Sequence, residues 1–486
     1  MSGIARLTVL STLAGAAACS FAPHYEVPSS AAPPPSYKEQ AGWQRATPQD
    51  AVARGEWWTL FADADLNRLE EKLHSDNLSL KAAVARLDQA RAQYRIARAD
   101  LFPTITAGGS ATREKFSVNA PRSLPGFATT YNDFVAQGDV SYELDLWGRV
   151  RNAVAAARAN TQASAADLAV VELSLRAELA VDYFTLRTDD AQIQVLDETT
   201  QAYGRSLELT SNLFKGGGAA LSDVAQSQAQ LETANTQAAE IRLQRAQTEH
   251  AIAVLVGENP SSFSLPSSPL PLSIAPPPLD PGMPSALLER RPDIAEAERR
   301  VAAANAQIGE ARAAYFPQFK LLGDGGVEST HTGNWFSAPS EIWALGPQVS
   351  LPIFEGGRLV AATAQAKAAF REQAANYRNT VLAAYQDVED NLAALRQLQR
   401  ESETQAAAVQ ATATALDQAQ KRYEAGIVTY LEVATAQTAA LQAQLAAVSI
   451  QARRMSSAVL LVKALGGGWQ SPRSSLAAAQ SQAQSH

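Results

Sequence analysis

The chain has 486 residues, a formal net charge of −8, five histidines and one cysteine. A negative chain is a poor partner for a nucleic-acid backbone, so we expect no nucleic-acid binding. The histidines are scattered without an HExxH motif, and no serine stands in a GxSxG motif. Composition and motifs therefore argue against a metal site, a cofactor and an enzymatic activity.

The N-terminus reads as a targeting segment. Arg6 precedes an apolar run from Leu7 to Ala18, which predicts a secretory signal peptide over residues 1–18. Cys19 follows at once and is typical of a lipoprotein acceptor that is acylated and anchored in lipid. Ala16 departs from the larger apolar residue usual at that place, so an ordinary cleaved signal that leaves a free thiol remains the alternative.

Residues 19–55 are rich in Pro, Ser and Ala without any period, which predicts an extended tether. Helix is expected to begin near Asp63 to Asp65. From Leu66 to Leu101 an apolar or aromatic residue recurs every seven positions without a break, as in helices that supercoil around neighbours.

Period-2 alternation appears in four places, which predicts strands at about 104–113, 134–147, 317–328 and 342–354. Each strand has one apolar and one polar face, and the polar face of the second strand carries Asp139, Glu143 and Asp145. The strands form two hairpins, with tips near 119–130 and 329–340. This pattern is typical of a membrane β-barrel, although a half-buried soluble sheet shows it too.

Four strands cannot close a barrel, because about eight are the minimum. An open sheet edge in lipid would leave backbone groups without hydrogen bonds. If these strands lie in a membrane, several chains must therefore share one barrel.

Two helical stretches at roughly 151–214 and 359–424 are too long for an ordinary globular domain and are expected to project. Their return helices are expected at 222–256 and 429–465. Ser222 is expected to cap the first return helix, with Asp223 in its first turn, and Thr429 with Glu432 to form a capping box for the second. Gly426, after Tyr423, is expected to form a left-handed cap, and Gly217 stands at the matching place.

Landmarks recur at a fixed distance along the chain. Gly148 and Gly357, Phe214 and Tyr423, and Gly217 and Gly426 are each 209 positions apart. Such a spacing predicts two copies of a domain-sized unit. We expect a first repeat at 56–258, a Pro-rich linker at 259–284, a second repeat at 285–467 and a disordered tail at 468–486.

The second repeat opens with LLERRPDIAEAERRVAAANAQIGEARAAYFP, residues 287–317, in which we expect one helix of about seven turns that ends before Pro317. ARADLFP repeats this hinge at Pro103. Together with YELDLWGRVR and the paired glycine turns, these motifs resemble the TolC-like and NodT-like outer-membrane factors, lipoprotein channels of RND-type tripartite efflux systems. The resemblance covers nearly the whole mature chain.

The resemblance implies a mainly α fold with a membrane β-barrel. Three chains would share twelve strands and extend a hollow barrel of coiled-coil helices into the periplasm. It implies a multidrug exit duct in the outer membrane that works with a periplasmic adaptor and an inner-membrane pump. The helix tips would form a closed aperture and receive the adaptor, with Gly217, Asp223, Tyr423, Gly426 and Glu432 as the tip residues. Val428 stands where some relatives carry an arginine that locks this gate.

Asp139, Glu143 and Asp145 would then face the lumen and make its field negative. Two other functions remain open from the residues alone. A periplasmic adaptor lipoprotein would have one helical hairpin and small β-domains, and a coiled-coil scaffold would be stable and soluble without its strands.

Overall fold

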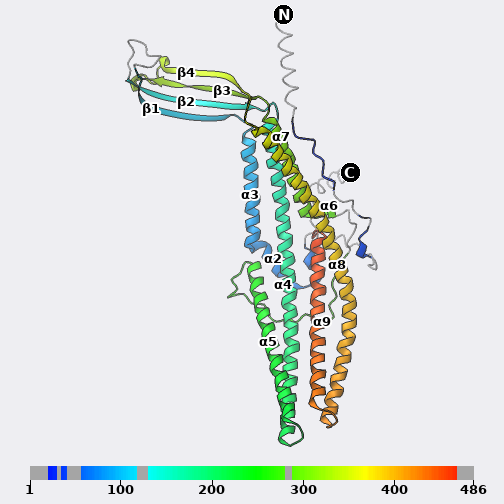
Figure 1. Cartoon of the computed structure of the whole chain (residues 1–486). Helices are drawn as coiled ribbons and strands as arrows, with labels where there is room; N and C mark the ends of the chain where they lie inside the picture. Colours follow the sequence, from blue (N-terminus) through cyan, green and yellow to red (C-terminus); the bar gives the residue numbers. More distant parts are fainter. Residues whose placement is uncertain are drawn as a thin grey trace, which may run out of the picture. The chain divides into compact units, whose positions relative to one another are not determined.

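The computed structural model describes residues 20–29, 34, 36–40, 56–117, 130–279 and 287–467. The described chain is mainly helical and holds one sheet of four strands (Figure 1). The helices are α2 (Ala64–Asp76), α3 (Leu78–Ala99), α4 (Arg149–Lys215), α5 (Leu221–Leu255), α6 (Leu287–Arg290), α7 (Pro292–Ala313), α8 (Arg358–Glu424) and α9 (Tyr430–Ala464). The strands are β1 (Thr104–Lys115), β2 (Thr130–Leu144), β3 (Gln318–Ser329) and β4 (Glu341–Ser350). Short 3₁₀ turns lie at Lys38–Gln40, Trp57–Phe61, Thr332–Asn334 and Ala338–Ser340.

Two compact units divide the chain, and several helices run through both. The strand unit comprises Met1–Ser29, Arg86–Ala165 and Glu296–Arg378. The helical unit comprises Ser30–Ala85, Ala166–Ala295 and Asn379–His486.

The sheet of the strand unit is an antiparallel meander in the order β1-β2-β3-β4. Its register aligns the apolar positions of all four strands: Ile105 lies opposite Val140, Val140 opposite Gly323, and Gly323 opposite Leu345. Because side chains alternate between faces, these residues share one side of the sheet. Ile105, Trp343 and Leu345 are 72 to 80% exposed, so the described part of one chain leaves this apolar face uncovered.

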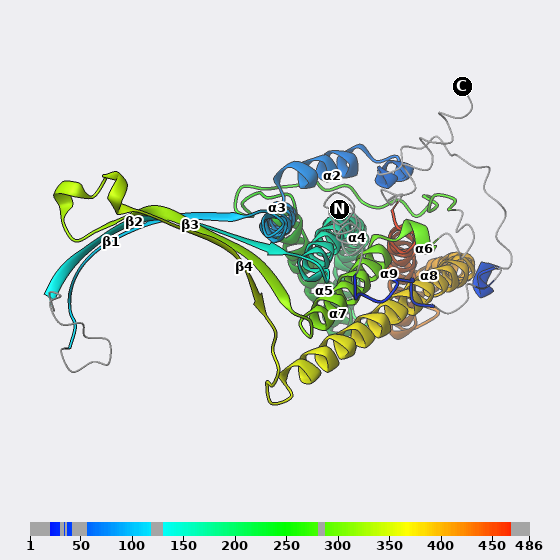
Figure 2. The same ribbon diagram turned by 90° about the horizontal axis from the view of Figure 1, so that it is seen from above.

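The strands end somewhat differently from the prediction. The second runs from Thr130 to Leu144 rather than to 147, because a tight turn follows in which Leu146 N–H donates to Leu144 O. The fourth ends at Ser350 rather than at 354, since Pro352 cannot donate to a ladder. The sheet curves and twists along its strands (Figure 2).

The core of the helical unit gathers around α2, the middle of α4 and the ends of α5 and α9. Leu66, Leu73, Leu186, Ile252 and Val459 are fully buried there. The seven-residue period runs on through a helix break, because the chain leaves the helix at Asn77 between α2 and α3. The Asn77 side chain accepts from Leu80 N and donates to Leu255 O, which replaces the helical hydrogen bonds at this break.

The single helix predicted within residues 287–317 is broken. α6 ends at Arg290 and α7 starts at Pro292, as expected for a first-turn proline. Arg291 between them is not helical, because a residue that precedes proline is disfavoured in the helical region.

Two helical hairpins extend from this core. The first hairpin is α4 with α5 and the second hairpin is α8 with α9. α4 and α8 each have 67 residues, and α5 and α9 each have 35. Both ends of α8 and α9 lie 209 positions after those of α4 and α5, for example 358 against 149 and 464 against 255.

Among the described residues one helix, α9, is long and apolar enough to cross a bilayer, with a mean hydropathy of 1.3 over its best window. Nearly half of that window is buried inside the chain, as in a core helix. Cys19, the signal peptide and the C-terminal tail lie outside the described residues.

Candidate functional site

The two hairpin tips end α4 and α8 in the same way. Gly217 and Gly426 have φ values of 75° and 71°, which favour glycine, and the residues after them return to the helix. Gly218 N–H donates to Leu213 O at 2.8 Å, and Ile427 N–H donates to Arg422 O at 2.9 Å. The left-handed cap predicted at Gly426 is confirmed.

The N-caps of the return helices differ from the prediction. Ser222 lies inside α5, and Ala220 is its N-cap, with Ala220 N–H donating to the Asp223 carboxylate at 3.3 Å. Thr429 is the N-cap of α9, but its side chain makes no capping bond. The predicted capping box is therefore wrong, because the Glu432 carboxylate is engaged elsewhere.

Glu432 accepts a hydrogen bond from Arg422 Nη1 at 2.5 Å, across the turn of the second tip. Both side chains are about half exposed, so the pair adds little to stability. Val428 packs against the neighbouring apolar cluster. The tip thus has a basic group bonded to its acid, supplied by Arg422 instead of by position 428.

Two tyrosines fill the interior of the second tip. The rings of Tyr423 and Tyr430 meet edge to face with centroids 5.5 Å apart, and both residues are buried. Tyr430 Oη donates to Gln437 Oε1 at 3.2 Å, and burial raises the pKa of Tyr430 to about 12. The Tyr423 hydroxyl is buried and has no hydrogen-bond partner among the described residues.

The first tip has no buried aromatic pair of this kind among its described residues. Phe214 and Leu221 occupy the positions that match Tyr423 and Tyr430, and they are 42% and 64% exposed. Asp223 matches Glu432, but Leu213 stands where the second tip has Arg422. The predicted tip residues therefore lie at two turns that have the same backbone conformation but different side chains.

A groove of about 470 Å³ opens between α8 and α9 next to the second tip. Small side chains form much of it, together with Leu431, which is 64% exposed. The lining residues are Ala415, Ala419, Thr429, Leu431, Glu432, Thr435, Ala436 and Ala439.

The acids predicted to face a lumen fall into two groups. Asp139 lies on the polar face of the sheet opposite Asp324 and accepts a hydrogen bond from Gln137 at 3.1 Å. Glu143 is held by two 2.8 Å hydrogen bonds from Arg149, and Asp145 pairs with Arg151. Glu143 and Asp145 are thus neutralised by arginines at the start of α4.

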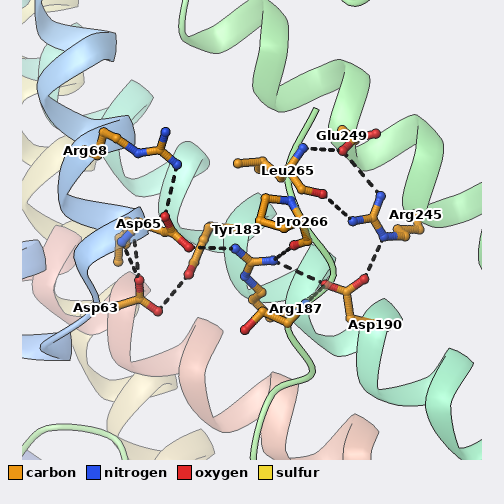
Figure 3. A network of polar contacts seen from close by, with 12 residues as sticks. Asp63, Asp65, Arg68, Tyr183, Arg187, Asp190, Arg245, Glu249, Leu265 and Pro266 are labelled. Carbon is orange, nitrogen blue, oxygen red and sulfur yellow. Dashed lines mark hydrogen bonds and ion pairs between the residues drawn. The ribbon is translucent and has the colours of Figure 1, made fainter. Parts of the chain in front are cut away.

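Within the helical unit a polar network joins the loop after α5 to α4 and α5 (Figure 3). Asp190, which is 1% exposed, accepts from Arg187 Nη1 at 3.3 Å and from Arg245 Nε at 2.6 Å. The two arginines donate in turn to the carbonyls of Pro266 and Leu265. Because each buried charge has a counter-charge and further hydrogen bonds, the network fixes the loop on α4 and α5.

Sequence reasoning missed the residues that complete these sites. Arg422 and Tyr430 stand ten and two positions before Glu432, Gln437 stands five positions after it, and nothing in the pattern marks them. The spacing of Arg187 and Asp190, three residues apart on a helix, could have signalled an ion pair. Among the described residues, no group of three or more His, Cys, Asp or Glu could hold a metal ion.

Comparisons with known proteins agree with this architecture. The model of the outer membrane efflux protein family matches residues 69–258 and 283–467. The probable efflux pump outer membrane protein TtgC of Pseudomonas putida is 35% identical over 455 residues, 93% of each chain. The outer membrane protein OprJ of Pseudomonas aeruginosa is 33% identical over 97% of each chain. The crystal structure of the Campylobacter jejuni CmeC outer membrane channel superposes with a TM-score of 0.84 at 27% identity, over 93% of this chain and 96% of that one.

Proposed function

Because the chain belongs to the outer membrane efflux protein family, we propose that three copies of it form a passive exit duct across the outer membrane. In this assembly a periplasmic adaptor connects the duct to an inner-membrane pump of the RND type. The pump supplies the energy, so the chain itself needs no catalytic site or cofactor. Family membership also decides against the adaptor and the scaffold that the residues alone left open.

The open sheet is the observation that carries the proposal of a shared barrel. In the described chain β1 and β4 each pair with only one neighbour, and the strands of 10 to 15 residues are long enough to cross a bilayer. Two free edges are not tolerated in lipid, so other copies must pair with them. Three copies of a four-stranded sheet supply twelve antiparallel strands, an even number that continues the meander.

The register supports an assignment of the two faces of that barrel. The apolar face, with Ile105, Trp343 and Leu345, faces lipid, and the face with Asp139 faces the lumen. Asp139 and Asp324 lie directly opposite each other on neighbouring strands, where like charges repel unless water surrounds them. A wet lumen provides that water, so we assign the negative field of the barrel to this pair. Glu143 and Asp145 contribute less, because arginines neutralise them.

The helices support a repeat and a periplasmic tube. Each of α4 and α8 would reach on the order of 100 Å if straight. The constant 209-residue shift of helix bounds supports two repeats, at 56–258 and 285–467, joined by the linker at 259–284. We place the tip residues Gly217, Asp223, Tyr423, Gly426 and Glu432 at the periplasmic aperture, where the adaptor docks.

The N-terminal segment supports a lipid anchor at Cys19. Phe21 stacks on Phe316 with ring centroids 4.4 Å apart, and Trp147 lies beside them and donates to Pro317 O. This aromatic cluster sits where α7 passes into β3. Aromatic rings of this kind favour the membrane interface, so the chain just after Cys19 would lie at the level where acyl chains enter the lipid.

The test is complementation of efflux with a matched pair of variants. Cells that lack the gene should accumulate ethidium, and the wild-type chain should restore its export. Leu345→Arg places a charge on the lipid face, which costs about 2–4 kcal/mol at mid-membrane, and should abolish restoration. Ala344→Arg places the same charge on the polar face beside Asp324 and should restore export. If both variants restore export equally, the strands do not lie in the membrane as proposed.

A further inference from the structure

One side of α7 binds the N-terminal segment of the same chain. Asn305 Nδ2 donates to Pro23 O at 2.8 Å, and Arg312 Nη1 donates to Phe21 O at 3.2 Å. Asn305 and Arg312 are seven positions apart, so they lie on the same side of the helix. Phe316, just after the helix, stacks on the Phe21 ring. This side of α7 is therefore a binding surface for an extended peptide.

Gly309 allows the peptide to lie close to α7. It is buried, and a Cβ at this position would lie 2.5 Å from Asn152 Nδ2 and 2.7 Å from Ala22 N. Glycine is the residue that lets another backbone approach a helix this closely. A larger side chain at position 309 would therefore push the N-terminal segment away from α7.

α3 is the counterpart of α7 in the first half of the chain. Both bounds of α7 stand 214 positions after those of α3, 292 against 78 and 313 against 99, and α3 leads into β1 as α7 leads into β3. All four residues that match the peptide-binding side of α7 are exposed. The residues that match Asn305, Gly309, Arg312 and Phe316 are Arg91, Arg95, Arg98 and Phe102.

This side of α3 cannot bind a peptide as α7 does, because Arg95 stands where the peptide needs Gly309. Arg91 pairs with Asp88 at 3.0 Å. Neither Arg95 nor Arg98 forms a salt bridge with a described residue. Guanidinium groups bind phosphate through paired, charge-assisted hydrogen bonds. The end of α3 therefore presents two cations that suit a phosphate group.

The residues that follow α3 place this pair of cations near lipid. Phe102 is 60% exposed, and Ile105, on the apolar face of the sheet, is 75% exposed. In the proposed duct that face meets lipid, so the end of α3 lies at the level of the headgroups. Arg95 and Arg98 are about 5 Å apart along the helix axis, and the headgroup layer on each side of the hydrocarbon is about 5–7 Å thick.

The N-terminal segment indicates which way this side of the helix points in the duct. The segment begins at the proposed lipid anchor Cys19, so it must run along the outside of the duct, and the side of α7 that binds it points outward. The two halves of the chain alternate around a ring of three copies. The matching side of α3 then points outward as well, away from the lumen.

We propose that Arg95 and Arg98 bind the phosphate groups of anionic phospholipids in the periplasmic leaflet of the outer membrane, with Phe102 among the acyl chains. Basic residues close to a membrane surface attract anionic headgroups, so the charges are complementary. The inference rests on the proposed duct and adds a second attachment to the membrane. The second half of each chain is attached through its N-terminal segment on α7, and the first half through phospholipid bound on α3.

Native mass spectrometry of the purified full-length chain in mild detergent tests this site. With added phosphatidylglycerol or phosphatidylcholine, the wild-type trimer should bind phosphatidylglycerol more tightly. Arg95→Gln with Arg98→Gln should lower the affinity for phosphatidylglycerol about 30-fold, because each arginine near an anionic lipid contributes about fivefold. The same variant should bind phosphatidylcholine as the wild type does. An unchanged affinity for phosphatidylglycerol would overturn the proposal.

Two control variants separate the site from net charge and from folding. Arg205→Gln with Arg400→Gln removes the same charge at exposed positions of α4 and α8 in the helical unit, and it should bind phosphatidylglycerol normally. Arg95→Lys with Arg98→Lys keeps the charges and should retain most of the preference. If either control loses phosphatidylglycerol as fully as the Arg95→Gln, Arg98→Gln variant does, Arg95 and Arg98 are not a phosphate site.

The same spectra distinguish failure of this site from failure of the duct, because they give the mass of the assembly. If the wild type is trimeric and exports ethidium but binds the two lipids equally, the phospholipid site is wrong and the duct stands. If the chain is monomeric and does not export ethidium, the proposed duct fails, and the phospholipid site fails with it.

Discussion

Asn77 and Arg291 stand at corresponding breaks in the two halves of the chain, and they hold the same helix end with different chemistry. Asn77 Nδ2 donates to Leu255 O, the last residue of α5, at 2.7 Å. Arg291 Nη1 donates to Ala464 O, the last residue of α9, at 3.1 Å. The two carbonyls are 209 positions apart, as the hairpins are.

The further hydrogen-bond partners of Arg291 and Asn77 also differ. Arg291 is also bonded to Asp293 and Asp387, so the second half closes its hairpin with a charged cluster. Asn77 uses a neutral amide and caps α3 with its own oxygen. Helix lengths and turns therefore repeat between the two halves, whereas the side chains that hold the helix ends differ.

The largest loss of stability is expected from Arg291→Met. It removes a nearly buried charge from two carboxylates and from the Ala464 carbonyl, and we expect a loss of about 3 kcal/mol. Asn77→Ala should cost about 1–2 kcal/mol, because it removes one cap and one hydrogen bond. The apparent melting temperature of the detergent-solubilised protein, followed by circular dichroism, should fall in the order wild type, Asn77→Ala, Arg291→Met. A reversed order would show that the Asn77 amide contributes more to stability than the charged cluster around Arg291.

A buried acid distinguishes the first half further. Glu70 in α2 is fully buried, and neither of its carboxylate oxygens is hydrogen-bonded to a described residue. Burial raises its pKa to about 9 although Arg176 opposes the shift. In the described second half α6 (Leu287–Arg290) lies at the positions that match the end of α2.

Glu70→Gln should change how stability depends on pH. Between the ordinary pKa of 4.5 and the raised value of about 9 the folded chain holds a proton that the unfolded chain has released. Glu70 makes its full contribution to the free energy of unfolding below the ordinary pKa. That contribution falls by about 1.4 kcal/mol per pH unit as the pH rises through the window. The variant should match the wild type near pH 5 and be more stable at pH 8. Glu71→Gln, at an exposed neighbour, is the control, and parallel curves for Glu70→Gln and the wild type would contradict the assignment.

The smallest effects are expected at the two tips. Gly217→Ala and Gly426→Ala each place a side chain at a positive φ with no neighbour within 4 Å, so each should cost about 1 kcal/mol from backbone strain alone. Gly204→Ala, inside α4, should stabilise by about 0.5–1 kcal/mol. Melting temperatures of the three variants test this. If Gly426→Ala lowers stability several times more than Gly217→Ala, Gly426 has a role beyond forming the left-handed helix cap.

Periodicity was sufficient to predict the strands and both long hairpins, because alternation and helical repeats act over many residues. It missed the breaks at Asn77 and Arg291, where a single side chain or the proline effect outweighs a long periodic signal. At the tips, the glycine turn was predictable from the local sequence. The Arg422–Glu432 pair and the Tyr423–Tyr430 contact were not, since they depend on how two helix ends meet in space. The groove was invisible to any pattern, because alanine carries no signal of what packs on it.

Accessibility of two cysteines tests the central claim that the sheet crosses the outer membrane while the tips lie in the periplasm. Ala338→Cys lies exposed between β3 and β4, and Ile427→Cys lies at the second tip, where Ile427 is 68% exposed. With a membrane-impermeant maleimide on intact cells, and the chain with Cys19 alone as background, only Ala338→Cys should be labelled. Both should react once the outer membrane is breached. Labelling of Ile427→Cys in intact cells, or of Ala338→Cys only after the breach, would contradict the duct.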